Sequence, residues 1–271
     1  YELKNELQQK KVNKNFANMK YLYNSASVVY QAKNTANPDS IGYISGTYKG
    51  PRDGTEDVYG ATVEAEIMFP FYFTNKTPIS RNFLSCSLFG LHTVNTASSN
   101  SLVGTTTTTL ASNDYANFQV YAIRESEKSK NVYFKLSSSH DPYPIPDLTS
   151  SIFFNVYNNN LWNFSIRLKP SNYPMAGLVS GSSTFTYDVI FRGTNHIAGH
   201  EHNSFEVSSS IVFGVGSKFL RSPKRIYAGT RRENLTGTVL QPSDVLIGGV
   251  KYWTKYLDDG SLDIHSKNLL N

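Results

Sequence analysis

Short segments in which apolar and polar residues alternate recur along most of this chain, and this pattern constrains the fold more than any other feature. In "TVEAEIMFPFYF", for example, Val63, Ala65 and Ile67 alternate with Glu64 and Glu66. Successive side chains of a strand point to opposite faces, so the alternation predicts one buried and one polar face. Further segments of strand type, separated by Ser-, Thr-, Asn-, Gly- and Pro-rich turns, are "FLSCSLFGLHTV", "NFQVYAIRE", "NVYFKLSS", "SSIFFNVYN", "LWNFSIRLK", "TFTYDVIFRG", "SFEVSSSIVFG", "KRIYAGT" and "VLIGGVKYW". Many short strands with turn signals predict an all-β sandwich or closed barrel.

The aromatic content supports this interpretation, because the 271 residues include 18 Tyr and 16 Phe. Aromatic and β-branched side chains suit a pleated, half-buried surface. No linker long enough to separate two cores interrupts residues 40–271, so the sequence predicts one domain there. Residues 1–39 differ in composition, and apolar residues recur near helical spacing at Leu3, Leu7 and Val12. We expect this segment to be an N-terminal arm or linker that is helical in part.

Charge and hydropathy argue against two classes of partner. The net charge of +5 is modest for this length and the basic residues form no strong patch, so we expect no nucleic-acid partner. No apolar run approaches the roughly 18 residues that span a membrane, so we expect no membrane partner either. The single cysteine, Cys86, cannot form an intrachain disulfide and lies in an apolar run, where we expect it to be buried.

The C-terminal stretch "DVLIGGVKYWTKYLDDGSLDIHSKN" predicts a strand followed by a short helix. Asp258 or Asp259 can cap this helix, because a side-chain oxygen at that position accepts from the first free N–H groups. Leu262 and His265 are three residues apart and therefore share one face of the helix.

This stretch resembles the last strand and helix of laminin-G-like, concanavalin A-like domains. The segments "GATVEAEIMFP", "LSCSLFGLH", "NNNLWNFSIRLKP" and "RIYAGTRRENLTGTVL" resemble other strands of that family. The resemblance implies a concanavalin A-like jelly-roll β-sandwich of two curved antiparallel sheets, with an N-terminal arm or helix and a short C-terminal helix. The long polar loops and the C-terminal end resemble domains of the large structural proteins of phages and other viruses.

Members of the resembled family bind carbohydrate, bind partner proteins or serve as scaffolds, and a minority hydrolyse glycosides, so fold alone does not decide function. The resemblance leads us to expect a non-enzymatic module of a virion or other surface assembly. Its partners would be other structural subunits, which the N-terminal arm could reach. The alternative is a carbohydrate-binding module that attaches to a host or cell surface. Either function predicts a location on a virion or an extracellular surface.

Carbohydrate recognition needs an aromatic ring beside polar side chains. The tyrosines of the predicted loops, Tyr143, Tyr157 and Tyr173, are the candidates for such a ring. Trp162 and Trp253 lie inside strand-like segments, where a large aromatic side chain usually fills a core or an interface.

Catalytic motifs are incomplete, so we expect no enzymatic activity. The resembled hydrolases carry Glu-x-Asp-x-(x)-Glu on one strand, and retaining hydrolysis needs two carboxylates about 5 Å apart. Here Glu64 and Glu66 are followed by Phe69 and Pro70, so the third acid is missing. We therefore interpret both glutamates as solvent-facing residues, with a glycosidase as a minor alternative. No nucleophile elbow or phosphate loop is present in the sequence.

The stretch "FRGTNHIAGHEHNSFE" is rich in histidine. Its His200, His202 and Glu206 match the core of the first metal motif of cupins, which are also jelly rolls. However, Gly193 is one residue too early for that motif, Gly214 is one too late, and no second motif follows. The Gly and Asn content instead predicts an exposed polar loop that joins two strands of a hairpin and offers a contact surface. Metal binding and a cupin-like enzyme remain minor alternatives.

We expect no cofactor, with calcium as the one option left open. Aspartates that could supply oxygen ligands are scattered along the sequence and form no tight cluster. They are Asp114, Asp141, Asp147 and Asp188.

Overall fold

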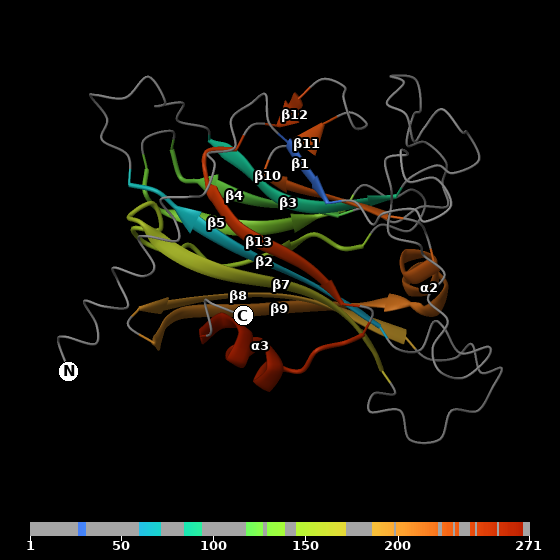
Figure 1. Ribbon diagram of the computed structural model, residues 1–271. Helices are drawn as coiled ribbons and strands as arrows, with labels where there is room; N and C mark the ends of the chain where they lie inside the picture. The colour runs from blue at the N-terminus through green and yellow to red at the C-terminus, as the bar shows by residue number, and fades with distance from the viewer. Residues whose placement is uncertain are drawn as a thin grey trace.

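The computed structural model describes two antiparallel β-sheets that face each other across a hydrophobic core (Figure 1). The described residues are 27–30, 60–71, 84–93, 118–126, 129–138, 145–171, 186–197, 199–221, 224–229, 231–232, 239–241, 243–253 and 255–267. The predicted all-β jelly-roll sandwich is therefore confirmed. Among these residues, no helix is both long enough and apolar enough to cross a membrane.

One sheet has six strands in the order β1-β10-β3-β4-β5-β6. Their bounds are β1 Ser27–Tyr30, β3 Ser85–Thr93, β4 Phe118–Arg124, β5 Val132–Ser137, β6 Leu148–Thr149 and β10 Lys224–Gly229. Because β1 pairs with β10, this sheet includes residues from the segment expected to be the arm. The helix expected around Leu3, Leu7 and Val12 lies outside the described residues.

The other sheet has five strands in the order β13-β2-β7-β8-β9, and every pair is antiparallel. Their bounds are β2 Ala61–Phe69, β7 Asn160–Pro170, β8 Thr186–Ile197, β9 His200–Val212 and β13 Leu246–Trp253. A short ribbon is formed by β11 Arg231–Arg232 and β12 Val239–Gln241. Helices α2 Phe213–Arg221 and α3 Asp259–Lys267 complete the described elements.

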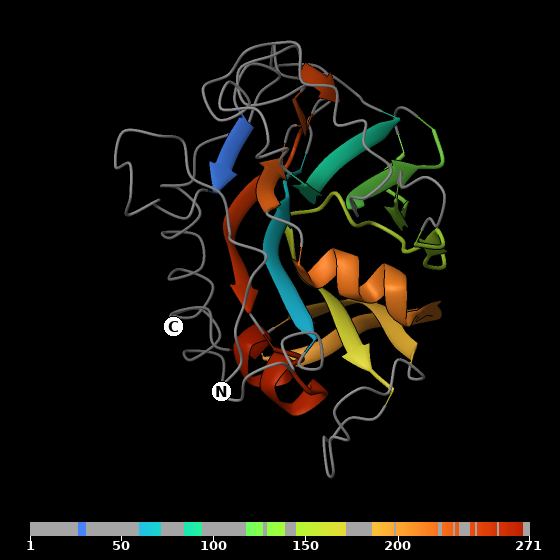
Figure 2. The same cartoon turned by 90° about the vertical axis from the view of Figure 1, so that its right-hand side faces the viewer.

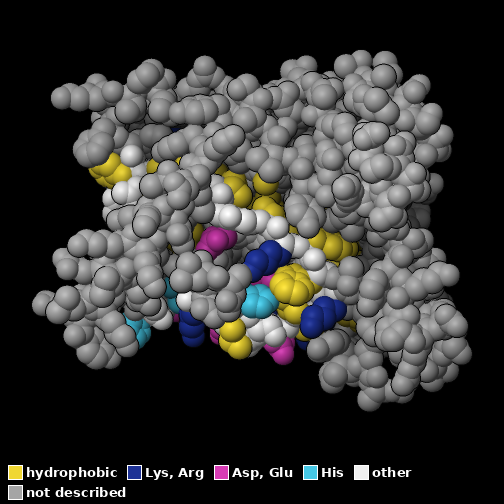
Figure 3. All heavy atoms as spheres, in the orientation of Figure 1, with side chains coloured by type: hydrophobic (Ala, Val, Ile, Leu, Met, Phe, Trp, Pro, Cys, Tyr) yellow, Lys and Arg dark blue, Asp and Glu magenta, His cyan; other side chains and the backbone are white. Residues whose placement is uncertain are grey.

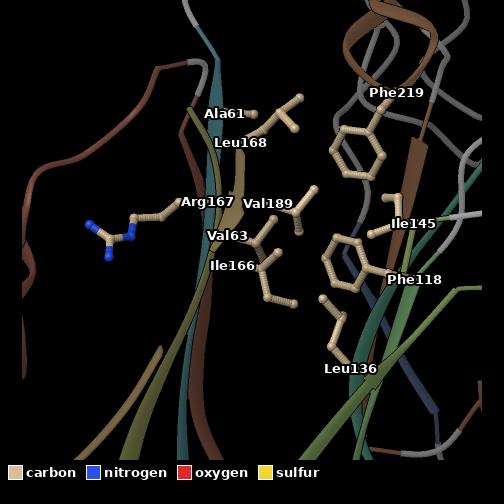
Figure 4. Close-up of a pocket in the computed structure, with 10 residues that line it drawn as sticks. All are labelled: Ala61, Val63, Phe118, Leu136, Ile145, Ile166, Arg167, Leu168, Val189 and Phe219. Carbon is tan, nitrogen blue, oxygen red and sulfur yellow. The ribbon is translucent and has the colours of Figure 1, made fainter. Parts of the chain in front are cut away.

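The alternation read from the sequence decides which face of β2 and β7 is buried. Val63, Ala65 and Ile67 point into the core, as predicted, and Trp162 on the adjacent strand is fully buried. The side chains that alternate with these, such as that of Arg167, point to the outer face of the five-stranded sheet. Figure 4 shows this around a small apolar void of about 10 Å³, from which only the Arg167 side chain turns away. The expected burial of Cys86 is also confirmed.

An ionic group lies inside the core, where the sequence pattern gave no sign of one. Arg124 of β4 donates to the Asp244 carboxylate over 2.6 Å, and both side chains are almost fully buried. The Tyr157 hydroxyl donates to the second oxygen of Asp244 over 2.8 Å, and the Arg124 guanidinium lies 3.8 Å from the centre of the Tyr157 ring. Burial raises the pKa of Asp244, while Arg124 and Tyr157 oppose that rise.

Helix α2 was not predicted, because the sequence "SFEVSSSIVFG" continues the strand pattern of β9. The chain becomes helical at Phe213, and Val215 and Phe219, one turn apart, are buried on the same face. Phe219 stacks on Phe118 of the opposite sheet, with ring centroids 5.9 Å apart. Figure 2 shows α2 across one end of the sandwich between the two sheets. A helix therefore closes this end of the core.

Helix α3 was predicted and is confirmed, on the outer face of the five-stranded sheet (Figure 2). Asp258 caps it, because its carboxylate accepts from the Ser261 backbone N–H over 2.8 Å. That hydrogen bond is the main cause of a lowered pKa for Asp258. Leu262 is buried against the sheet and His265 contacts Glu64, so the two residues share one face as expected.

Candidate ligand-binding site

A surface hollow of about 560 Å³ lies between the chain that follows β6 and the β8–β9 hairpin. Its volume falls within the range of about 300–1,000 Å³ that is usual for small-molecule sites. The residues that line it are Ile152, Phe153, Phe154, Asn155, Asn158, Asn160, Ile197, His202 and Asn203. Most of them are apolar or carry an amide group.

The hollow exists because the segment predicted as the strand "SSIFFNVYN" does not form one. Phe153 alone makes a bridge, with its N–H and C=O bonded to Val132 of β5. Asn155 and Asn159 then adopt positive φ angles of 54° and 58°, which turn the chain toward β7. Asparagine tolerates this left-handed conformation better than most residues. The prediction of a strand in this segment is therefore wrong.

Phe153 anchors this segment while its neighbours face solvent. Its ring is buried and lies 5.0 Å from Trp162 and 5.8 Å from Phe205. Because successive residues point in opposite directions, Ile152 and Phe154 turn outward and are 43% and 71% exposed. The hollow thus has a rigid aromatic floor and an exposed phenyl ring at its rim.

Side-chain amides hold the turn in place. Asn131 accepts a hydrogen bond from the backbone N–H of Asn155 over 3.2 Å. The Asn160 side chain donates to the Asn155 carbonyl over 2.9 Å, and the Asn159 side chain accepts from the Phe71 N–H over 2.9 Å. These bonds fix the backbone before any ligand arrives, which lowers the entropy cost of binding.

The lining suits a ligand that has both an apolar face and hydroxyl groups. Ile197 of the hairpin is 44% exposed, so three of the exposed large hydrophobic residues in the described ranges border this one hollow. The side chains of Asn158 and Asn203 offer amide donors and acceptors. None of the described lining residues is Asp, Glu, Lys or Arg.

The tyrosines expected to bind carbohydrate do not form this site. Tyr157 is only 2% exposed, and its hydroxyl is bonded to Asp244, so its ring offers no face to a sugar. The prediction of Tyr157 as a sugar-binding residue is wrong, because Tyr157 lies in a turn but its side chain points into the core. Tyr143 and Tyr173 lie outside the described residues. Phe154 was missed because the strand pattern assigned it to a sheet.

The histidine-rich stretch forms the β8–β9 hairpin, as predicted, but it is not a long loop. Pairing between the strands continues to Ile197 and His200, and Gly199, which precedes His200, has a φ of 81°. The expected exposed loop is therefore mostly strand. Burial lowers the pKa of His196 on β8, which favours its neutral form. His202 on β9 is exposed and lines the hollow.

The groups considered as metal ligands are separated by other contacts. Glu206 bonds to Arg167 over 2.6 Å on the outer face, while His200 and His202 are exposed near the hairpin turn. Within the described ranges, no three His, Cys, Asp or Glu side chains are placed to hold one ion. Asp147 pairs with Lys135, and Asp188 accepts from Ser210. Asp114 and Asp141 lie outside the described residues.

The two glycines that flank the histidine-rich stretch differ in their surroundings. A Cβ atom on Gly193 would lie 2.3 Å from the Phe205 ring, whereas a Cβ on Gly214 would meet nothing within 4 Å. We predict that Gly193→Ala lowers the free energy of unfolding by about 1–3 kcal/mol, because the Phe205 ring must shift within a packed core. Gly214→Ala, the matched control, should leave it unchanged or slightly raised, because alanine favours the helix. Urea unfolding followed by circular dichroism measures both, and equal losses would contradict the packing role.

Glu64 and Glu66 lie on the outer face of β2, but they are not freely solvated. The Glu64 carboxylate lies 2.9 Å from Nδ1 of His265 on α3, and its side chain is 14% exposed. Burial raises the pKa of Glu66, and the charge of Lys251 opposes that rise. The prediction of two solvent-facing acids is thus wrong for Glu64, because α3 covers that part of the strand.

No protein-family model matches the chain, and no curated protein matches its sequence. Solved structures with a similar arrangement include the CBM2 module of Lactobacillus casei BL23 phage J-1 evolved Dit, with 9% identity, TM-score 0.36 and coverage of 80% of this chain and 69% of that one. The endo-1,3-beta-glucanase of Streptomyces sioyaensis has 9% identity, TM-score 0.34 and coverage of 83% and 73%. Alginate lyase Aly36B has 10% identity, TM-score 0.32 and coverage of 90% and 88%. These similarities concern overall architecture and assign no activity to this chain.

Proposed function

We propose that this protein is a non-enzymatic carbohydrate-binding module that attaches to glycans at a virion, host or cell surface. The observation that carries the proposal is the hollow between residues 152–160 and the β8–β9 hairpin. An exposed phenyl ring stands there beside amide groups, on a backbone that is already fixed. Small-molecule sites usually combine apolar surface with a few placed polar groups in this way. The C–H face of a sugar ring can lie on Phe154 while its hydroxyl groups bond to the asparagines.

The outer-face carboxylates support a binding function over a hydrolytic one. Glycoside hydrolysis needs an acid and a second carboxylate on opposite sides of an accessible sugar bond. The Glu64 carboxylate is bonded to His265 of α3 and its side chain is only 14% exposed, which does not suit a group that must face a sugar bond. We therefore expect the purified protein to bind glycans without cleaving them.

The proposal is tested by Phe154→Ala on a glycan array and by calorimetry. The substitution should weaken glycan binding by about tenfold or more, because ring stacking on the sugar is lost. Thermal stability should stay the same, because Phe154 is 71% exposed and supports little of the core. The matched control is Ile264→Ala, which removes an exposed side chain from α3, away from the hollow. Absence of glycan binding by the unmodified protein, or equal binding by Phe154→Ala, would contradict the proposal.

The expectation of a structural module that contacts other subunits stays a prediction. The residues expected to reach a neighbour, 1–39, are described only at β1. A different surface, beneath α3, supplies an argument for a protein partner.

A further inference from the structure

The outer face of the five-stranded sheet carries two arginines whose acidic partners come largely from α3. Arg167 of β7 donates to Asp259 over 2.6 Å, and its other partners include Glu206 at the same distance. Arg192 of β8 donates to Asp263 over 2.6 Å and lies 3.2 Å from Asp259. Figure 3 shows basic, acidic, histidine and hydrophobic side chains gathered on this face of the molecule. The sheet thus presents positive charge, and α3 supplies a matching pair of carboxylates.

The contact between α3 and the sheet leaves polar groups of the sheet unsatisfied. Ser165 Oγ and Arg167 Nε are buried without a hydrogen-bond partner in the described structure, and so is Trp253 Nε1. A hollow of about 20 Å³ remains beneath the helix, bordered by Ser165 and Asp263. Buried polar groups are normally bonded, so each exception calls for an explanation. Here the exceptions indicate a polar face that α3 covers but does not fully complement.

Helix α3 buries few of its own side chains. Only Leu262 and Ser266 are buried among its residues, and the side chains of Asp259 and Asp263 are 60% and 38% exposed. Water and salt can reach these carboxylates, although the Arg167 and Arg192 side chains are only 1% and 13% exposed. The chain just before the helix is anchored to the sheet, because the Thr62 hydroxyl donates to the Lys255 carbonyl and accepts from the Leu257 N–H, and this tether keeps α3 at a high effective concentration beside the face.

We propose that this face is a docking site for an acidic helix of a partner protein, and that α3 occupies the site in the isolated chain. The partner helix would carry two carboxylates four residues apart, as Asp259 and Asp263 are, with an apolar residue at the position of Leu262. We choose an acidic helix because its carboxylates would be complementary in charge to Arg167 and Arg192. A partner that also bonds the Ser165 hydroxyl and the Trp253 indole would bind better than α3 and shift the equilibrium toward release of α3.

The test uses the full chain carrying Asp259→Asn and Asp263→Asn, which weakens α3 as a competitor and leaves both arginines intact. The probe is a fluorescent peptide of residues 256–267, held helical by a lactam bridge on its exposed side. Anisotropy should show that this peptide binds the double variant about tenfold or more tightly than the unmodified chain, because the tethered helix no longer excludes it. Binding should weaken as salt rises. A peptide with the same two Asp→Asn changes is the control and should not bind.

Failure of the unmodified peptide to bind a correctly folded double variant would overturn the proposal. Binding of polygalacturonate in place of the peptide would overturn the choice of a protein partner. If the double variant does not fold, hydrogen exchange on the unmodified chain decides the matter. The amides of α3 should exchange through local opening, well before those of β7 and β8. Exchange of α3 only together with the sheet would contradict a displaceable helix.

Discussion

Replacing Asp244 with alanine is expected to lower the free energy of unfolding by about 3–5 kcal/mol, because the change leaves Arg124 as a buried charge without its carboxylate. Both side chains of this pair are at most 4% exposed, so water cannot replace the missing partner. The substitution also removes the acceptor of the Tyr157 hydroxyl, which lies in the core. The pair joins β4 to the chain just before β13 and therefore connects the two sheets.

Urea unfolding measured by fluorescence and circular dichroism tests this prediction. Asp147→Ala is the matched control, because Asp147 makes an ion pair of the same length, 2.6 Å, but is 48% exposed. Its loss should cost at most about 1 kcal/mol. The double substitution Arg124→Met with Asp244→Leu should recover much of the stability, because no charge is left buried. Similar losses for Asp244→Ala and Asp147→Ala would show that burial does not determine the cost.

Phe134→Ala is expected to lower the free energy of unfolding by about 3–5 kcal/mol as well, because it removes a fully buried ring at the centre of the aromatic core. The Phe134 ring lies 4.8 Å from both Trp162 and Phe164 and 5.6 Å from Phe205. Residues from both sheets meet at this ring, so neither sheet can close the cavity alone.

The same substitution should also weaken glycan binding at the hollow. Phe134 lies 6.0 Å from Phe153, which forms the floor beneath Phe154. Tyr133→Ala is the matched control, because the adjacent residue of β5 points the other way and is half-buried. It should cost far less stability and leave binding unchanged. Thermal unfolding and calorimetric titration measure the two effects, and equal costs at both positions would contradict the central role of Phe134.

Local alternation was sufficient to find most strands. Nearly every strand-like segment of the sequence forms a strand, because each has an apolar side that must be buried and a polar side that must not. The strand prediction for "SSIFFNVYN" was wrong, because the alternation of apolar and polar residues cannot show where a chain turns away from the neighbouring strand. Two asparagines at positive φ decide that turn, and the turn exposes Phe154.

The residues of the candidate site were harder to find for a related reason. Tyr157 and Phe154 are both aromatic residues of one turn-rich segment, and the sequence favoured Tyr157, which is buried, over Phe154, which is exposed. Asp244 and Arg124, which lie far away in the sequence, contact Tyr157 inside the core, and Phe69 packs against its ring. The spacing of His200, His202 and Glu206 is that of metal ligands. In the structure, however, Arg167 from another strand forms an ion pair with the Glu206 carboxylate.

The sequence by itself therefore determined the β class, the C-terminal helix and the burial of Trp162 and Cys86. Each of these depends on side chains that are close together in the sequence. Their spacing matches the repeat of a strand, two residues, or of a helix, about 3.6 residues. The tertiary structure decided the hollow, the buried Arg124–Asp244 pair and the cover that α3 places over Arg167. Each of these depends on which distant strands become neighbours, and a local pattern carries no information about that.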